Sequence, residues 1–290
     1  MTARRRLTPY GLLAPGAIWL ALFFVVPMYF MGELALRSGT FTEGFTFSWQ
    51  FSNFPDALEG NGELITRTFL YSGISTLLAL LIAYPLAYAI AVKASPRWRL
   101  LLLFAVIAPF FTTYLIRTIA WKTILADSSP VVDVLQFLQL IPDDGRVLAT
   151  STAVIAGLTY NFLPFMILPI YASLERLDLS LIEAAKDLYS SARQAFLRVT
   201  LPLSMPGIVA GVLLTFIPAF GDYVNAQLLG SPNQFMIGNR IQSLYLADRN
   251  YPEAAALSFL MMAAVLIVVL VYIRAAGTQA FMGDEEEARA

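Results

Sequence analysis

The sequence predicts an all-α membrane protein with six transmembrane helices. Hydrophobic residues make up 58% of the 290-residue chain, and its mean hydropathy is +0.67. Charged residues account for 13% of the chain, whereas a soluble domain carries about a quarter. We therefore expect the lipid bilayer to surround most of the chain, so its length does not give a count of soluble domains.

Six apolar runs are long enough to cross the hydrocarbon core, which takes about 20 residues of helix. The first follows Arg4, Arg5 and Arg6 and is longer than the apolar part of a secretory signal, so it is expected to remain as an anchor. The predicted spans are 11–32, 68–92, 99–126, 147–173, 203–228 and 254–275.

The distribution of basic residues predicts which way the chain is oriented. An even number of spans puts both termini on one side, and that side holds twelve of the 19 Lys and Arg residues. The positive-inside rule then places both termini of this multi-pass membrane protein in the cytoplasm. The expected organisation is a cytoplasmic N-terminus (1–10), one six-span transmembrane domain (11–275) and an acidic cytoplasmic tail (276–290).

Absent residue types exclude several kinds of chemistry. The chain contains no Cys and no His, so disulfides, His or Cys metal sites and a Ser-His-Asp triad are impossible. This disfavours an intramembrane enzyme. The sequence also lacks a GxxxxGK[ST] phosphate-binding loop, so ATP-driven work would require a separate ATPase.

A charged segment lies between the predicted fourth and fifth spans, within residues 174–202. Ser180 with Glu183, and Ser191 with Gln194, have the spacing of two helix capping boxes. Together they predict two short helices, and Pro202 is expected to end the second. Each helix has one apolar face, which could pack either on a membrane surface or in a groove on a soluble partner.

One motif in this segment resembles a known family. Glu183-Ala184-Ala185, followed by Val199-Thr200-Leu201-Pro202, resembles the EAA loop of ABC-importer permeases, which inserts a coupling helix into a cleft of the cytoplasmic ATPase. That motif usually has Gly six residues after the Glu, where this chain has Tyr189. The resemblance implies an ATPase-coupling surface formed by Glu183, Ala184, Ala185, Asp187, Tyr189, Arg193, Leu201 and Pro202.

The resemblance continues from about residue 66 onward. Residues 99–125, 161–178 and 228–242 are similar to the B-type permease subunit of spermidine/putrescine importers. This implies a type I ABC importer permease of the prokaryotic inner membrane. It would work with a second permease subunit, a dimer of ABC ATPase subunits and an extracytoplasmic polyamine-binding protein. ATP and Mg would bind to the ATPase, and no cofactor or nucleic acid is expected on this chain.

A polyamine path would need carboxylates and aromatic faces. Asp222 is predicted to lie about 22 Å along the fifth span, where Pro218 and Gly221 can interrupt the helix. An acidic residue at that depth points to function, but it also suits a carboxylate that reaches the outer interface. The candidate path residues are Asp222, Tyr223, Asn225, Tyr160, Asn161 and Tyr114.

Two basic residues of the predicted third span suit a different role. Counted along one straight helix, Arg117 and Lys122 lie about 27 and 34 Å from Arg99 and are expected to be interfacial anchors. Other cargoes, such as ferric iron or sulfate, remain open; an anion path should contain more buried Arg. A self-contained secondary transporter would need no docking loop, and the sequence has no obvious internal repeat.

Overall fold

The computed structural model describes residues 13–142, 145–187 and 190–276, and helices dominate them. The predicted N-terminus (1–10), the acidic tail (277–290 of it) and Tyr189 lie outside the described residues. The chain forms two compact units, Met1–Gly62 with Arg240–Ala264 and Glu63–Asn239 with Val265–Ala290, called unit 1 and unit 2 here.

Unit 1 combines apolar helices with a small β-hairpin. The helix Leu13–Ala35 contains a π-helical turn, and the hairpin pairs Arg37 with Phe47 and Thr40 with Gly44 in antiparallel register. Gly39 has φ +120°, and a Cβ there would lie 2.2 Å from the Gly44 carbonyl oxygen, so this turn requires glycine. The elements are η1 (Ala21–Val25), α2 (Val26–Ala35), β1 (Arg37–Thr40), β2 (Gly44–Phe47) and α3 (Asn53–Glu59). Two further helices, α14 (Ile237–Leu246) and α15 (Tyr251–Ala276), run through a unit boundary.

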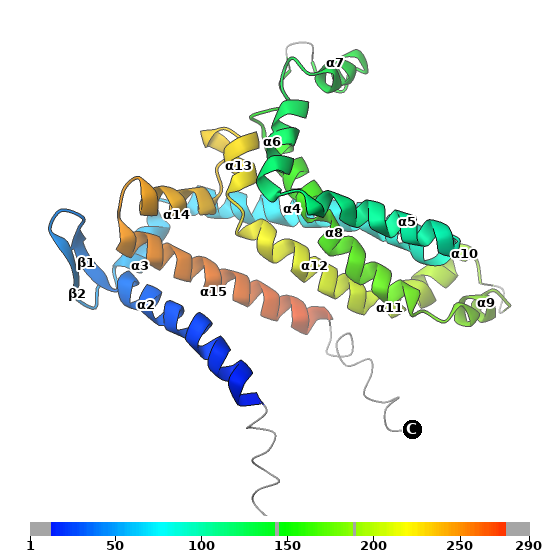
Figure 1. The fold of residues 1–290 in the computed structure, drawn as a ribbon, viewed down its shortest axis with the longest axis horizontal. Helices are drawn as coiled ribbons and strands as arrows, with labels where there is room; N and C mark the ends of the chain where they lie inside the picture. The colour runs from blue at the N-terminus through cyan, green and yellow to red at the C-terminus, as the bar shows by residue number, and fades with distance from the viewer. Residues whose placement is uncertain (1–12, 143–144, 188–189, 277–290) are drawn as a thin grey trace, which may run out of the picture. The chain divides into compact units, whose positions relative to one another are not determined.

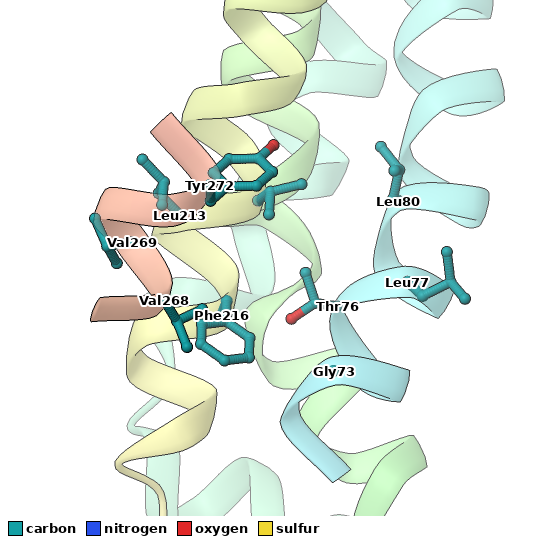
Figure 2. Close-up of a pocket in the computed structure, with 10 residues that line it drawn as sticks. Gly73, Thr76, Leu77, Leu80, Leu213, Phe216, Val268, Val269 and Tyr272 are labelled. Atoms are coloured by element: carbon teal, nitrogen blue, oxygen red, sulfur yellow. The ribbon is translucent and has the colours of Figure 1, made fainter. Parts of the chain in front are cut away.

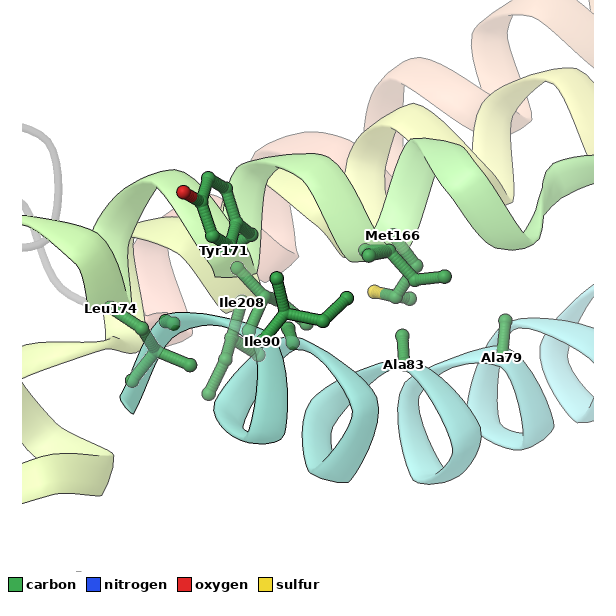
Figure 3. Packing of buried hydrophobic residues seen from close by; sticks show 11 residues of the cluster. Ala79, Ala83, Ile90, Met166, Tyr171, Leu174 and Ile208 are labelled. Carbon is green, nitrogen blue, oxygen red and sulfur yellow. The ribbon is translucent and has the colours of Figure 1, made fainter. Parts of the chain in front are cut away.

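Unit 2 is built around two long helices and a shorter one. Helix α8 (Ser151–Glu175) is capped by Thr150, whose hydroxyl accepts a hydrogen bond from the Ala153 backbone amide. It packs extensively along α12 (Met205–Phe220) (Figure 1). Ala79, Ala83 and Ala87 recur every fourth residue on α4 (Gly62–Tyr88). These buried alanines form a seam of small side chains that packs against α8. Figure 3 shows Ala79 and Ala83 of this seam near Met166. Small residues let membrane helices approach closely, which strengthens van der Waals packing.

Most remaining elements of unit 2 lie at the ends of these long helices, whereas α5 (Pro96–Ile107) packs beside them through Leu102, Leu103 and Val106. α6 and α13 pack together at one end, and α9, α10 and α11 gather at the other (Figure 1). The remaining elements of unit 2 and their bounds are η2 (Ala89–Lys93), α5 (Pro96–Ile107), η3 (Ala108–Phe111), α6 (Tyr114–Ile124), α7 (Pro130–Phe137), α9 (Leu179–Asp187), α10 (Ala192–Ala195), η4 (Phe196–Thr200), α11 (Leu201–Leu203), α13 (Val224–Leu229) and η5 (Pro232–Gln234).

The helices only partly match the predicted spans. Four described helices are long and apolar enough to cross a membrane: Leu13–Ala35, Gly62–Lys93, Ser151–Glu175 and Tyr251–Ala275. Two bent pairs raise the number to six only if each pair counts as one span. The mostly helical membrane fold is confirmed, and the six-span topology stays a prediction.

The predicted third span is not one straight helix. Pro96–Phe111 and Tyr114–Ile124 meet at 95°, because Thr112 and Thr113 are extended and interrupt the helical hydrogen bonds. Distances counted along a straight helix to Arg117 and Lys122 were therefore wrong. The predicted fifth span (203–228) is also divided, because α12 (Met205–Phe220) and α13 (Val224–Leu229) are separate helices. At its start, Met205–Phe220 meets the preceding helix Ala192–Leu203 at 63°.

The close contact between α8 and α12 gives a first testable prediction. A Cβ on Gly207 would lie 2.5 Å from the Pro169 carbonyl oxygen, so Gly207→Ala should destabilise the protein by about 1–3 kcal/mol through overpacking. Thermal unfolding of the purified chain in detergent measures this effect. Gly73→Ala on α4 is the matched control, because its Cβ would meet nothing within 4 Å. A Gly207→Ala protein as stable as the control would contradict the packing argument.

Candidate functional site

A buried polar cluster surrounds the point where α12 ends. The helix stops at Phe220 and α13 begins at Val224, so Gly221, Asp222 and Tyr223 form a break between them. The break predicted near Pro218 and Gly221 is therefore confirmed. Interrupted backbone in a membrane must find new hydrogen-bond partners within the protein.

Asp222 is held from two directions. Its Oδ1 accepts a hydrogen bond of 2.8 Å from the Asn225 backbone amide at the start of α13, and its Oδ2 accepts one from the Tyr114 hydroxyl of α6. The side chain is only 8% exposed. The carboxylate thus points into the helix bundle of unit 2, whereas a residue reaching for the outer interface would present it outward.

Three further polar side chains complete the cluster. The side-chain amide of Asn225 donates to the Tyr114 hydroxyl at 2.5 Å. The side-chain amide of Asn161 donates to Asn225 Oδ1 at 3.1 Å and to Thr118 Oγ1 at 3.2 Å. Asn161, Asn225 and Thr118 are buried. Within the described residues, Asn161 Oδ1 is buried and has no hydrogen-bond partner, so this oxygen is available to accept a hydrogen bond.

A glycine and an asparagine that the sequence analysis missed, Gly157 and Asn239, also shape this site. A Cβ on Gly157 would lie 2.7 Å from Asn225 Oδ1, so only glycine lets α8 approach α13 this closely. Asn239 donates to the Tyr223 carbonyl oxygen at 2.9 Å and thereby satisfies the interrupted backbone. Gly157 and Asn161 are four residues apart and share a helix face, and that spacing was the one available signal.

The six predicted path residues separate into two groups. Tyr114, Asn161, Asp222 and Asn225 meet in the cluster, whereas Tyr223 is 39% exposed. Tyr160 packs against Trp121, with ring centroids 5.2 Å apart, and lines a separate cavity of about 140 Å³. Their role in a translocation path stays a prediction.

Arg117 lines the same cavity as Tyr160. Its guanidinium stacks 4.4 Å from the centre of the Phe110 ring, and its Nε and Nη1 atoms are buried without hydrogen-bond partners among the described residues. This environment differs from that of an interfacial anchor whose charge reaches water. Lys122 is exposed, as an anchor should be.

A larger cavity in unit 2 has a different character. Its volume is about 300 Å³, and it lies between α4, α12 and the end of α15. Figure 2 shows apolar side chains on its wall, such as Leu213 and Phe216. The polar side-chain groups on its wall are the hydroxyls of Thr76 and Tyr272. Because it contains no carboxylate, it is poorly suited to a polycation.

The predicted coupling segment consists of two helices, as expected. Ser191 and Gln194 form the predicted capping box at α10. The other predicted box was wrong, because α9 begins at Leu179 and the Asp178 carboxylate accepts from the Ser180 amide at 2.9 Å. This backbone hydrogen bond from Ser180, together with its side-chain hydrogen bond, lowers the pKa of Asp178. The capping residue is therefore Asp178, and Glu183 has no part in the cap.

The two helices of this segment differ in their attachment to the bundle. Glu183, Ala184, Asp187 and Arg193 are exposed. After α10, Phe196 packs edge-on against Tyr84 with ring centroids 5.6 Å apart, and the Tyr84 and Ser204 hydroxyls are 2.9 Å apart. Helix α11 continues one residue beyond Pro202, to Leu203. The segment thus presents charges outward while its second part is joined to α4 and α12.

A family comparison identifies this architecture. Residues 17–278 match the model of the family described as "Binding-protein-dependent transport system inner membrane component". The chain belongs to this family.

Relatives in the family cover most of the chain. It is 37% identical to the spermidine/putrescine transport system permease protein PotB of Haemophilus influenzae, over 89% of this chain and 90% of that protein. It is 40% identical to PotB of Escherichia coli K12, over 73% of this chain and 77% of that protein. The E. coli inner membrane ABC transporter permease protein YdcU is 35% identical, over 73% and 70%.

A solved structure supports the fold of this transport-system component. A chain of a bacterial ABC transporter involved in the import of the acidic polysaccharide alginate aligns with a TM-score of 0.75. The alignment covers 94% of this chain and 96% of that chain, at 22% identity. At that identity the likeness establishes an ABC-importer permease fold and carries no information on cargo.

The hydrogen-bonded cluster gives a second prediction. Tyr114→Phe removes the hydroxyl that donates to Asp222 and accepts from Asn225, leaving buried polar groups unsatisfied. We expect a loss of about 1–3 kcal/mol in unfolding free energy, the cost of one unpaired buried group. Thermal unfolding in detergent measures the loss. Tyr223→Phe, which alters an exposed ring in the same break, should stay close to wild type, and equal losses in both variants would contradict the assignment.

Proposed function

We propose that this chain is the permease subunit of an ATP-driven importer that moves polyamines, spermidine or putrescine, into the cytoplasm. The observation that carries the proposal is the 37% and 40% identity to PotB proteins across most of the chain. A second permease, an ABC ATPase dimer that binds ATP and Mg, and an extracytoplasmic binding protein complete the proposed complex. One solved relative is a transporter in complex with its periplasmic protein, which supports the last of these partners.

The proposed topology has six spans in one permease domain with both termini in the cytoplasm. It counts the bent pair Pro96–Phe111 with Tyr114–Ile124 as the third span and assigns Met205–Phe220 to the fifth, so residues 192–202 stay in the cytoplasmic segment. The excess of Lys and Arg on the side of the termini supports this orientation. It places segment 174–202 beside a cytoplasmic ATPase.

The buried cluster is the proposed cation-binding part of the path. Asp222 supplies a carboxylate, and the Asn161 Oδ1 atom supplies an unoccupied acceptor beside it. A protonated amine of the cargo donates to such oxygens and is attracted by the negative charge. Because Tyr114 already donates to Asp222, the arriving amine replaces that hydrogen bond, and the carboxylate has a donor before and after the cargo passes.

An anionic cargo is the second candidate, because one observation favours it. The Arg117 guanidinium, with two buried nitrogen atoms that lack partners among the described residues, lies on a cavity of about 140 Å³. An anion would pair with it, whereas a polyamine would be repelled. The two cargoes therefore predict opposite roles for Arg117 and Asp222.

The cargo proposal is tested by removing each charge in turn. Asp222→Asn should lower polyamine uptake by roughly tenfold or more, since each 1.4 kcal/mol of lost attraction is a factor of ten. The loss should be larger for spermidine than for putrescine, because attraction grows with cation charge. Uptake of each radiolabelled polyamine is measured in cells that have no other importer for it.

Arg117→Gln is the matched control, because it removes the opposite charge in unit 2. Co-purification of the ATPase should be unchanged in both variants. Full polyamine uptake by Asp222→Asn would overturn the role of Asp222 in the path. Sulfate uptake that is lost with Arg117→Gln and kept with Asp222→Asn would establish the anionic cargo instead.

The coupling proposal is tested at Glu183. This side chain is exposed on α9, and we propose that it pairs with a basic group in the ATPase cleft. Loss of one partner of a buried interfacial charge pair costs about 2–5 kcal/mol. Glu183→Gln should therefore abolish most substrate-stimulated ATP hydrolysis and uptake, while the permease still reaches the membrane. ATPase assays on the reconstituted complex measure this.

Asp178→Asn provides a control for local charge and helix stability. Asn caps a helix about as well as Asp, so this change removes a charge near α9 and keeps the cap. We expect it to retain nearly full ATPase stimulation. If Glu183→Gln also behaves as wild type, Glu183 is not the coupling residue.

A further inference from the structure

Three aromatic side chains in unit 1 are exposed next to one another. Phe47, Trp49 and Phe51 are 45%, 61% and 62% exposed. The Phe47 and Trp49 ring centroids are 4.9 Å apart, and those of Trp49 and Phe51 are 6.1 Å apart. We call these residues the aromatic ladder. So large an exposed apolar surface marks a contact with another apolar phase or molecule.

The backbone is strained in order to present the central ring. Trp49 has φ +53°, in the left-handed region that a bulky side chain rarely adopts because its Cβ crowds the backbone. Glycine would adopt this conformation without cost. An outlier of this kind points to a role for the side chain that occupies it.

Hydrogen bonds attach the ladder to the end of an apolar helix. The amides of Ser48 and Gln50 donate to the Leu36 carbonyl oxygen at 3.4 and 3.0 Å. The Asn53 side chain donates to the carbonyl oxygens of Ala35 and Arg37, each at 2.9 Å. The bonds to Ala35 and Leu36 satisfy carbonyl groups at the C-terminal end of α2. Together with the bond to Arg37, they hold the ladder beside the end of the helix.

The length of the helix Leu13–Ala35 sets the depth of the ladder in the bilayer. Leu13–Ala35 is long and apolar enough to span the bilayer, and none of its most apolar window is buried within the chain. A helix of 23 residues is about 34 Å long, close to the hydrocarbon thickness of about 30 Å. Its Ala35 end, and therefore the ladder, lies at the depth of the lipid headgroups.

We propose that the aromatic ladder is a lipid-interface anchor that fixes the depth of the Ala35 end of the first span. Trp rings are enriched at this depth because they offer an apolar body and a polar N–H. Residues 47–53 carry no charged side chain, so none opposes insertion between headgroups. The ladder continues the lipid-facing surface of Leu13–Ala35, and the proposal is independent of the cargo.

Depth-resolved fluorescence quenching tests this proposal. Replacing the other three of the four tryptophans by Phe (Trp19→Phe, Trp98→Phe and Trp121→Phe) leaves Trp49 as the only tryptophan of the chain, and it is excited at a wavelength that tyrosine does not absorb. The full chain is reconstituted in phosphatidylcholine nanodiscs with spin labels on the headgroup or in the middle of the acyl chain. We expect blue-shifted emission, little quenching by iodide, and stronger quenching by the headgroup label than by the acyl label.

A single tryptophan deeper in the same helix is the matched control. Phe24→Trp, in a chain without the native tryptophans, lies about 16 Å along the helix from Ala35 and should be quenched more by the acyl label. Water-like Trp49 emission with strong iodide quenching would overturn the anchor. Protection from both iodide and lipid labels would also overturn it, because a protein surface would then cover the ladder.

Substitutions at Trp49 separate anchoring from local folding. Trp49→Gly relieves the backbone strain but deletes the ring, whereas Trp49→Tyr keeps an interfacial aromatic residue. With a single Cys at exposed Ser52, we expect Trp49→Gly to react several-fold faster than wild type with a membrane-impermeant maleimide. Trp49→Tyr should react at nearly the wild-type rate. Equal rates in Trp49→Gly and wild type would show that the ring does not hold the loop in the interface.

Discussion

Much of unit 2 is organised around one constraint: a carboxylate at an interrupted helix must be satisfied by protein groups. Asp222 is 8% exposed, so its carboxylate is largely removed from solvent. A carboxylate in such a medium is costly unless hydrogen bonds and nearby charge compensate for lost hydration. The Tyr114 hydroxyl and the Asn225 backbone amide supply these bonds. Both donors must lie next to the same carboxylate, which constrains how the surrounding helices bend and pack.

The bend between α5 and α6 and the glycine of α8 bring those donors together. The 95° turn starts a new helix at Tyr114, so this residue reaches Asp222 from α6. Gly157 removes the side chain that would keep α8 away from Asn225, and Asn161 on the same face can then donate to it. The interruption of α12 is thus supported from three helices. This arrangement leaves Asn161 Oδ1 as a spare acceptor.

The opposite end of α12 has a mechanical connection to the exposed segment of α9 and α10. Phe196 packs on Tyr84, Ser204 meets the Tyr84 hydroxyl, and Gly207 allows α12 to touch α8 along its backbone. Close-packed helices transmit displacement because their interior has little free volume. Movement imposed on this segment would therefore pass into α12, which leads to Asp222 just beyond its last residue, and into α8, which carries Asn161 near its middle.

The sequence by itself determined the class of protein, since composition and apolar runs depend only on residue type and order. The Ser191–Gln194 cap and the break after Phe220 were also predictable, because capping and helix interruption are local properties of the chain. The tertiary structure alone decided that Asp178 caps α9, that Arg117 is partly buried beside Phe110, and that Tyr114 bonds to Asp222 from 108 residues away. Such contacts depend on where helices bend and how closely glycines let them approach, and no spacing along one helix contains that information.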